Sequence, residues 1–167
     1  FADYGENKKN IHLAISLIKG KRMDLAIEKS VEFGVKSIHP ILFERSIKKR
    51  LNIERLNKII ISSAKQTGRS VFPEIKKITK FSDWIKKYKN DNSFACHFSG
   101  KFKIKNVVNS KTNNIMIIVG PEGDFSTSEI ELLNVSKIPL VNLGPRRLRT
   151  ESACISSILE TSDAIER

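Results

Sequence analysis

Residues 115–129, IMIIVGPEGDFSTSE, decide the fold of this chain. The unbroken apolar run 115–119 is typical of a central strand that is buried on both faces. Gly120 and Gly123 then predict a turn, and Ser126 with Glu129 forms a capping box, which marks the start of a helix. A strand, a glycine turn and a helix in this order form the repeating unit of an α/β domain with a parallel sheet.

The same unit recurs on both sides of this stretch. Downstream, a strand at 140–143 is followed by Gly144-Pro145 and a helix over about 150–165. Upstream, alternating apolar positions predict strands at 11–18 and 35–42, with a helix between them that ends at Gly34. The remaining predicted elements are a helix from Asn52 to Gly68, a short strand at 72–78, a helix at 83–89 capped by Ser82, a strand at 93–98 and a basic connection at 101–114. The sequence therefore predicts one α/β domain over residues 1–167, with a mainly parallel sheet flanked by helices.

Charge is distributed unevenly along the chain. The formal net charge is +12 over 167 residues. Residues 1–120 carry 25 basic and 10 acidic side chains, whereas residues 121–167 carry 5 and 8. A concentrated positive field is typical of a protein that meets a polyanion such as RNA, and a lysine-rich solubilising surface is the alternative.

Several classes of protein are excluded or disfavoured by composition. No apolar run approaches the roughly 20 residues that span a bilayer, so no membrane association is expected. Two cysteines, Cys96 and Cys154, are too few for a disulfide framework or a cysteine-rich zinc site, and they indicate buried apolar positions in a reducing cytoplasm. The G-x-G-x-x-G, P-loop and H-E-x-x-H motifs are absent, so no metal site is predicted.

The two glycine turns are the candidate ligand site. Each follows an apolar strand and precedes a helix, and such turns gather at the carboxyl edge of an open α/β sheet, where ligands bind. A single Gly-Pro-x-Gly sequence is most often an ordinary turn, but two such turns in consecutive units favour a binding site. His97 falls at the end of the strand that precedes them, while His12 and His39 are scattered.

The turns also resemble the signatures of a known family. Residues 120–130, GPEGDFSTSEI, and 143–153, LGPRRLRTESA, resemble G-P-E-G-G-F-S-x-x-E-I and L-G-x-R-I-L-R-x-E-T-A of the family that methylates uridine N3 in small-subunit ribosomal RNA (the RsmE family of the SPOUT superfamily). Residues 27–35, 44–46 and 64–69, followed by Pro73, are similar to further blocks of this family in the same order. Asp124 stands where the family has glycine, Arg147 where it has an apolar residue, and Ser152 where it has threonine.

The resemblance implies more than the residue pattern can establish. It implies a SPOUT-like fold with a C-terminal trefoil knot, S-adenosylmethionine as the cofactor, ribosomal RNA or the small ribosomal subunit as the partner, and a homodimer with a shared active site. The family's N-terminal PUA-like RNA-binding barrel has no counterpart in this sequence, so we expect the catalytic domain alone. The expected cofactor contacts are Gly120, Glu122, Gly123, Leu143, Gly144, Leu148 and His97.

Methylation at uracil N3 requires the loss of a weakly acidic proton, which a cation near the forming anion would assist. The candidate catalytic residues are Arg149, Arg69 and Glu122, with Glu122 holding a cation or acting as the base. The expected RNA contacts are Arg45, Lys48, Lys49, Arg50 and Arg69. Each arginine has a phosphate contact or a surface ion pair as its alternative role. A related knotted methyltransferase for another RNA and a non-catalytic RNA-binding module remain alternative functions.

Overall fold

A parallel β-sheet forms the centre of the computed structural model, which describes residues 4–89, 92–108 and 112–166. Its strands lie in the order β3-β2-β1-β6-β5-β7, and β4 also pairs with β2. All of these pairs are parallel. The bounds of the strands are β1 (Asn10–Ser16), β2 (Val35–Leu42), β3 (Glu74–Ile75), β4 (Thr79–Lys80), β5 (Ser93–Cys96), β6 (Asn114–Val119) and β7 (Leu140–Val141).

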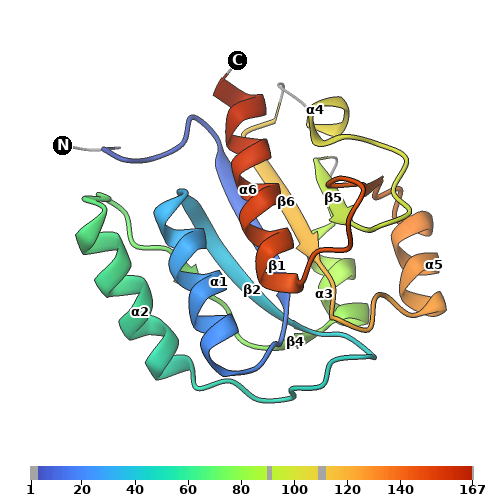
Figure 1. The fold of residues 1–167 in the computed structure, drawn as a ribbon, viewed down its shortest axis with the longest axis horizontal. Helices are drawn as coiled ribbons and strands as arrows, with labels where there is room; N and C mark the ends of the chain where they lie inside the picture. Colours follow the sequence, from blue (N-terminus) through green and yellow to red (C-terminus); the bar gives the residue numbers. More distant parts are fainter. Residues whose placement is uncertain (1–3, 90–91, 109–111, 167) are drawn as a thin grey trace.

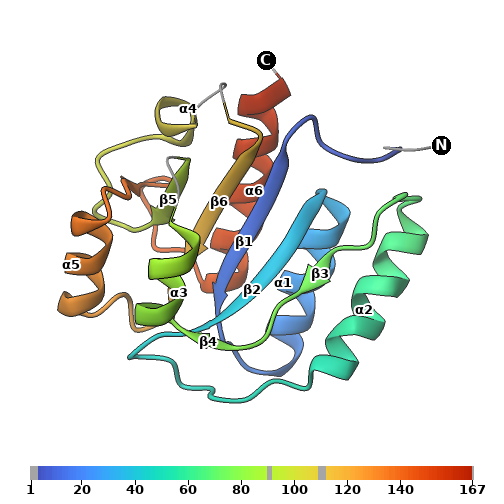
Figure 2. The same ribbon diagram turned by 180° about the vertical axis from the view of Figure 1, so that it is seen from behind.

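Helices cover both faces of the sheet. Figure 1 shows one face covered by α1 (Gly20–Glu32), α2 (Ile53–Gln66) and α6 (Thr150–Glu166). Figure 2 shows α3 (Phe81–Tyr88) and α5 (Thr127–Val135) on the opposite face. The short helix α4 (Ile104–Val107) lies in the connection from β5 to β6. The expected α/β architecture, a mainly parallel sheet flanked by helices, is therefore confirmed, while the implied trefoil knot stays a prediction.

The alternation of side chains on the central strands explains the two layers. On β6, Ile115 and Ile117 are buried in the core beneath α1, α2 and α6, whereas Met116 and Ile118 are buried in the core beneath α3 and α5. A strand with apolar residues on both faces has no face that can meet water, so it must take a central position. This explains why β6 pairs with both β1 and β5.

Local sequence signals are met at several helix ends and fail at others. Asn52 caps α2 by accepting from the backbone N–H of Arg55 at 3.0 Å, and Ser126 with Glu129 forms the expected capping box of α5. The expected cap Ser82 is wrong: α3 begins at Phe81, which is buried against the sheet, and this packing decides where the helix starts. The basic connection also contains α4, because Ile104 packs into the core. In the part of the chain that the structure describes, no helix is long and apolar enough to cross a membrane.

A chain of hydrogen bonds links two histidines inside the fold. The Trp84 indole N–H donates to His39 Nδ1 at 3.1 Å, so His39 carries its proton on Nε2, which faces Ser37 Oγ at 2.8 Å. Ser37 Oγ in turn lies 2.7 Å from His12 Nδ1. Burial lowers the pKa of His39 to about 4, and the positive charges of His12 and Lys76 act in the same direction. A second proton on His39 would point at the Trp84 N–H, so this network requires a neutral ring.

We therefore expect acid to destabilise this fold through His39. Because its pKa is lower in the folded state than in the unfolded chain, stability is complete above pH 6.5 and is lost as the pH falls from 6.5 to about 4. The loss attributable to this residue is about 3 kcal/mol at most. Urea unfolding at several pH values should show a shallower acid dependence for His39→Gln than for the wild type. Parallel pH profiles for the two proteins would contradict this account.

Candidate active site

The two glycine turns meet at the carboxyl edge of the sheet and form a cleft, as the sequence predicted. The connections that leave β5, β6 and β7 supply its walls, and α6 supplies its floor. We call this cavity the glycine cleft; it holds about 710 Å³ of empty space, including its open mouth. Its lining residues are Cys96, His97, Phe98, Val119, Gly120, Pro121, Glu122, Asp124, Asn142, Leu143, Gly144, Arg146, Arg147, Leu148, Thr150 and Ala153.

The first turn is held in place by contacts that cross the cleft. The hydroxyl of Thr150, the first residue of α6, donates to the carbonyl oxygen of Gly120 at 3.1 Å. A Cβ at Gly120 would lie 2.9 Å from the buried ring of Phe125, so only glycine allows this close packing. Asp124 adopts a left-handed φ of +66°, the conformation that glycine at this position of the family signature would take readily. Asp124 therefore keeps the turn and adds a carboxylate to the cleft.

The second turn presents open backbone to the cleft. Gly144 has a φ of +135°, and no atom of the residues that the structure describes lies within 4 Å of the place where its Cβ would stand. Its N–H donates to the Asn142 side chain at 2.8 Å, and Asn142 donates to the carbonyl oxygen of Phe98. The guanidinium of Arg147 lies 5.4 Å from the centre of the Phe98 ring. These contacts join the second turn to the loop that follows β5.

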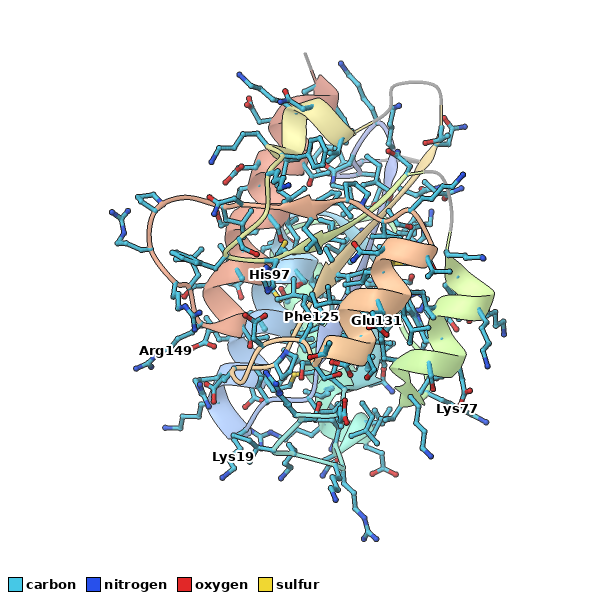
Figure 3. The ribbon with its side chains drawn as sticks, turned by 90° about the vertical axis from the view of Figure 1, so that its right-hand side faces the viewer. Lys19, Lys77, His97, Phe125, Glu131 and Arg149 are labelled. Atoms are coloured by element: carbon cyan, nitrogen blue, oxygen red, sulfur yellow. The ribbon has the colours of Figure 1, made fainter. Side chains whose placement is uncertain are left out.

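His97 links that loop to the first turn. The backbone N–H of Ser99 donates to His97 Nδ1 at 3.2 Å, so the ring proton lies on Nε2. Nε2 faces the Asp124 carboxylate at 3.1 Å. Figure 3 shows His97 and Phe125 within the molecule beside the start of α5. His97 therefore fixes the orientation of Asp124 at the wall of the cleft.

Most of the expected cofactor residues gather here, with one exception. Gly120, Glu122, Leu143, Gly144, Leu148 and His97 all line the glycine cleft. Gly123 does not, and a Cβ at this position would stand 3.4 Å from the Arg45 side chain. A side chain at Gly123 would therefore meet the loop after β2, and the expected contact of this residue with the cofactor stays a prediction.

A second cavity, which the sequence did not predict, lies on the other side of the Pro121–Glu122 turn. We call it the α1 cavity; it holds about 410 Å³ of empty space, mouth included, at the start of α1. Arg22 of α1 forms an ion pair with Glu122 and lies 4.0 Å from Glu151 Oε2, a buried atom with no hydrogen-bond partner among the described residues. The lining residues are Leu17, Ile18, Lys19, Arg22, Arg45, Ile47, Pro121 and Glu122. Arg22 follows a strand and Gly20 in the sequence, just as the residues of the two glycine turns follow a strand and a glycine. This pattern is the signal that could have placed Arg22 at the site.

The basic loop after β2 is tied to the same turn. Arg45 donates to the carbonyl oxygen of Gly123 at 2.8 Å, and the Glu129 carboxylate accepts from the backbone N–H of Glu44 at 2.7 Å. Glu129 also accepts from the N–H of Ser126 at 2.8 Å, so one buried carboxylate holds both the loop and the start of α5. The expected RNA contacts Lys48, Lys49 and Arg50 are all exposed on this loop.

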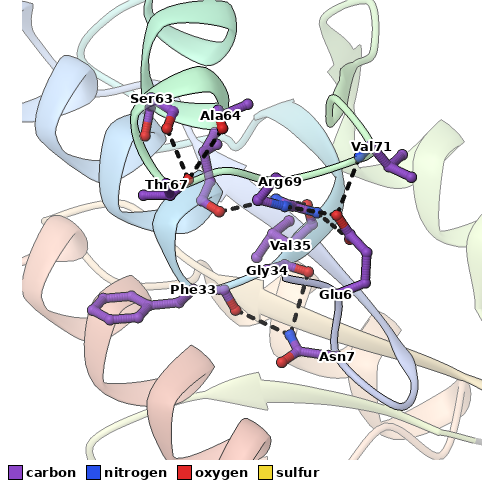
Figure 4. Close-up of polar contacts among 11 residues, drawn as sticks. Glu6, Asn7, Phe33, Gly34, Val35, Ser63, Ala64, Thr67, Arg69 and Val71 are labelled. Carbon is purple, nitrogen blue, oxygen red and sulfur yellow. Dashed lines mark hydrogen bonds and ion pairs between the residues drawn. The ribbon is translucent and has the colours of Figure 1, made fainter. Parts of the chain in front are cut away.

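Arg69 requires a correction. It lies near the start of β2, at the amino edge of the sheet, where its guanidinium is buried and pairs with Glu6 through both carboxylate oxygens, at 2.6 and 3.1 Å (Figure 4). Its Nη1 also donates to the carbonyl oxygens of Val31 and Val35 at 2.9 and 3.0 Å. A guanidinium with these partners and 1% exposure has a structural role, in place of the catalytic and RNA-binding roles expected from the sequence.

Arg149 lies outside the lining of both cavities. It precedes α6 directly, and its carbonyl oxygen accepts from the backbone N–H of Ala153 at 2.8 Å. Its side chain is exposed and points away from the fold in Figure 3, unlike that of its neighbour Leu148, which lines the cleft. Only a substrate or another chain that covers this surface would therefore meet the guanidinium.

Comparison with known proteins identifies the class. A family profile described as "RNA methyltransferase domain" matches residues 5–160, so the chain belongs to this family of domains. The crystal structure of a ribosomal RNA small subunit methyltransferase E from Neisseria gonorrhoeae bound to S-adenosyl methionine is similar, with a TM-score of 0.88 and 30% identity over 95% of this chain and 67% of that one.

Sequence relatives specify the family. Ribosomal RNA small subunit methyltransferase E of Buchnera aphidicola subsp. Acyrthosiphon pisum is 35% identical over 92% of this chain and 63% of that protein. The protein of the same name from Mesomycoplasma hyopneumoniae is 32% identical over 90% of this chain and 68% of its own length. This chain therefore belongs to the family of ribosomal RNA small subunit methyltransferase E, as the resemblance implied. It spans just under two thirds of the length of the Buchnera relative.

The placement of Arg69 leads to a prediction about stability. Arg69→Met leaves the Glu6 carboxylate buried without its partner, and we expect the free energy of unfolding to fall by about 3–5 kcal/mol. Arg55→Met is the matched control, because Arg55 pairs with Asp24 but is 54% exposed, and exposed pairs contribute about 1 kcal/mol or less. Urea unfolding of both variants measures the difference. An Arg69→Met protein of wild-type stability that had no methyl transfer activity would restore the catalytic assignment.

Proposed function

We propose that this chain is the methyltransferase domain of an enzyme that transfers a methyl group from S-adenosylmethionine to N3 of a uridine in small-subunit ribosomal RNA. The observation that carries the proposal is the glycine cleft, formed by the same two turns that carry the family signatures. The Neisseria relative, which was solved with S-adenosyl methionine bound, supports the cofactor, and the curated relatives support the substrate.

The residues of the cleft fit this cofactor. Gly144 offers a cradle that a side chain would fill, so a ligand can lie against its backbone. Glu122 and Asp124 line the cleft and suit a ligand that carries a positive sulfonium, while Arg146 and Arg147 suit its carboxylate. Leu143 and Leu148 provide apolar surface for the adenine ring. When bound, S-adenosylmethionine would supply an electrophilic methyl group.

The chain's own part in the reaction concerns the proton at uracil N3. N3 of uracil can accept a methyl group only after this proton has been removed. Glu122 is our candidate to accept the proton, because its carboxylate lies in the wall that the glycine cleft and the α1 cavity share. Arg22 forms an ion pair with the Glu122 carboxylate and would hold this carboxylate in position. We propose that Arg149 acts on the same substrate once RNA or a second protomer covers its exposed loop.

The oligomeric state and the cellular location of the protein are also part of this proposal. We propose a homodimer, which the family resemblance implies, and the exposed apolar side chains of Leu148 and Leu159 at and before α6 give it a candidate contact. A cytoplasmic location follows from the proposed ribosomal substrate. A related methyltransferase for another RNA differs from this proposal only in its target, whereas a non-catalytic RNA-binding module would leave the cleft without a cofactor.

Mass mapping of small-subunit ribosomal RNA tests the function directly. A strain that lacks the gene should lack one N3-methyluridine, and the wild-type gene should restore it. Ala153→Leu should not, because Ala153 lines the glycine cleft, and the larger side chain should weaken S-adenosylmethionine binding about 10- to 100-fold in calorimetry. Asn134→Leu adds the same side chain on the exposed face of α5 and is the control. An unchanged methylation map in the deletion strain would refute the substrate, and absence of cofactor binding by the wild type would favour the RNA-binding module.

The basic loop and Arg149 should separate binding from catalysis. Neutralising Lys48, Lys49 and Arg50 together should weaken RNA binding and reduce its salt dependence by roughly one unit of slope for each phosphate that is no longer bound. Cofactor affinity should not change. Arg149→Ala should keep RNA affinity and lower turnover by about 10²-fold, because removal of a charge that stabilises the transition state has that effect. Filter binding over a salt series and single-turnover kinetics measure the two. A normal slope in the triple variant together with a reduced slope in Arg149→Ala would reverse the two roles.

A further inference from the structure

The α1 cavity lies against the glycine cleft without being part of it. Pro121 and Glu122 line both, so the two spaces meet at the turn after β6. A methyl donor and its acceptor must approach within about 3–3.5 Å for transfer. A cavity that shares its wall with the cofactor cleft is therefore the place where an acceptor can approach the methyl group while both ligands are bound.

Four charged side chains line the α1 cavity: Lys19, Arg22, Arg45 and Glu122. Arg22 comes from the start of α1 and pairs with the Glu122 carboxylate, and Arg45 comes from the loop after β2. Arg22 is held by Glu122 and by the nearby Glu151, and Arg45 by the carbonyl oxygen of Gly123. These contacts use only some of the five N–H donors of each guanidinium. The cavity thus offers a hydrogen-bond donor, an acceptor and a second donor.

Apolar side chains supply the remaining walls. Leu17 and Ile18 are buried at the end of the β1 strand, and Ile47 is 66% exposed at the mouth of the cavity. A large aliphatic side chain with this exposure is available to cover a flat ring that enters the cavity. A planar ring with polar edges would thus pack its face on apolar side chains and place its edge next to charged side chains. Apolar walls with a few polar groups are the usual composition of a small-molecule site.

We propose that the α1 cavity receives the target uracil base and identifies it by its imide edge. Uracil presents a carbonyl oxygen, the N3–H and a second carbonyl oxygen. Arg22 and Arg45 would donate to the two oxygens, and Glu122 would accept from N3–H. Cytosine presents a lone pair at N3 and an amino group at N4, so it would set a lone pair against the Glu122 carboxylate and a donor against an arginine. The inference rests on the proposed function and adds to it the base-binding site and the residues that select uracil.

This arrangement requires an unstacked nucleotide. A base inside a helix cannot present its imide edge to a protein cavity, so the uridine must be single-stranded or flipped out. Lys19, which lines the cavity and is labelled at the edge of the molecule in Figure 3, is placed to meet the phosphate of such a nucleotide. The exposed basic side chains of the loop after β2 would then hold the flanking RNA.

Methyl NMR of the intact protein tests the site without any need for turnover. Uridine monophosphate, titrated in the presence of S-adenosylhomocysteine, should shift the methyl signals of Leu17, Ile18 and Ile47. Cytidine monophosphate should bind about 10- to 100-fold more weakly, because it leaves buried polar groups unsatisfied. Arg22→Gln should abolish this preference, whereas Arg55→Gln, an arginine that pairs with Asp24 outside the cavity, should keep it.

The outcomes separate this inference from the proposed function. Equal shifts with both nucleotides, shifts confined to other methyl groups, or no shifts at about 50 mM nucleotide (a ceiling of about 2 kcal/mol in binding free energy) would overturn the base site. If the wild type also restores N3-methyluridine in the deletion strain, the proposed function stands and only the base site is refuted. If uridine selects the cavity but no ribosomal N3-methyluridine depends on the gene, the base site stands and the ribosomal target is wrong.

Discussion

The hydrogen bonding of the central strands is the constraint on which the rest of the structure depends. β1 and β6 are buried over most of their length, so their backbone groups must be satisfied along both edges by neighbouring strands. Parallel pairing then sends every strand-to-helix connection out at the carboxyl edge. The loops after β1, β2, β5, β6 and β7 therefore meet in one place, and both cavities form there.

Side-chain contacts between these loops give the site its shape. Glu129 joins the loop after β2 to the start of α5, and Thr150 joins the start of α6 to Gly120. His97 and Asp124 connect the loop after β5 to the first turn. Because most of these donors and acceptors are partly or fully buried, the contacts order each loop against its neighbours and define the shape of the cleft.

The two edges of the sheet differ in how their charged side chains are arranged. At the amino edge, Arg69 with Glu6 satisfies buried polar groups, and the chain from Trp84 through His39 and Ser37 does the same on the face of the sheet that α3 covers. At the carboxyl edge, Glu122, Asp124 and Arg22 remain partly exposed beside open space. Glu122 and Asp124 line the glycine cleft together with Arg146 and Arg147, whereas Lys48, Lys49 and Arg50 are exposed on the loop after β2.

The sequence by itself determined the order of strands and helices, the two glycine turns, and the family to which their signatures belong. These follow from local periodicity, capping and turn chemistry, which act over a few residues. Tertiary structure alone decided that Arg69 is buried against Glu6, that Gly123 faces Arg45 instead of the cleft, and that Arg22 meets Glu122 a hundred residues away. The role of a charged side chain depends on the partners that folding brings within contact distance. The separation of two residues along the sequence does not predict which of them become partners.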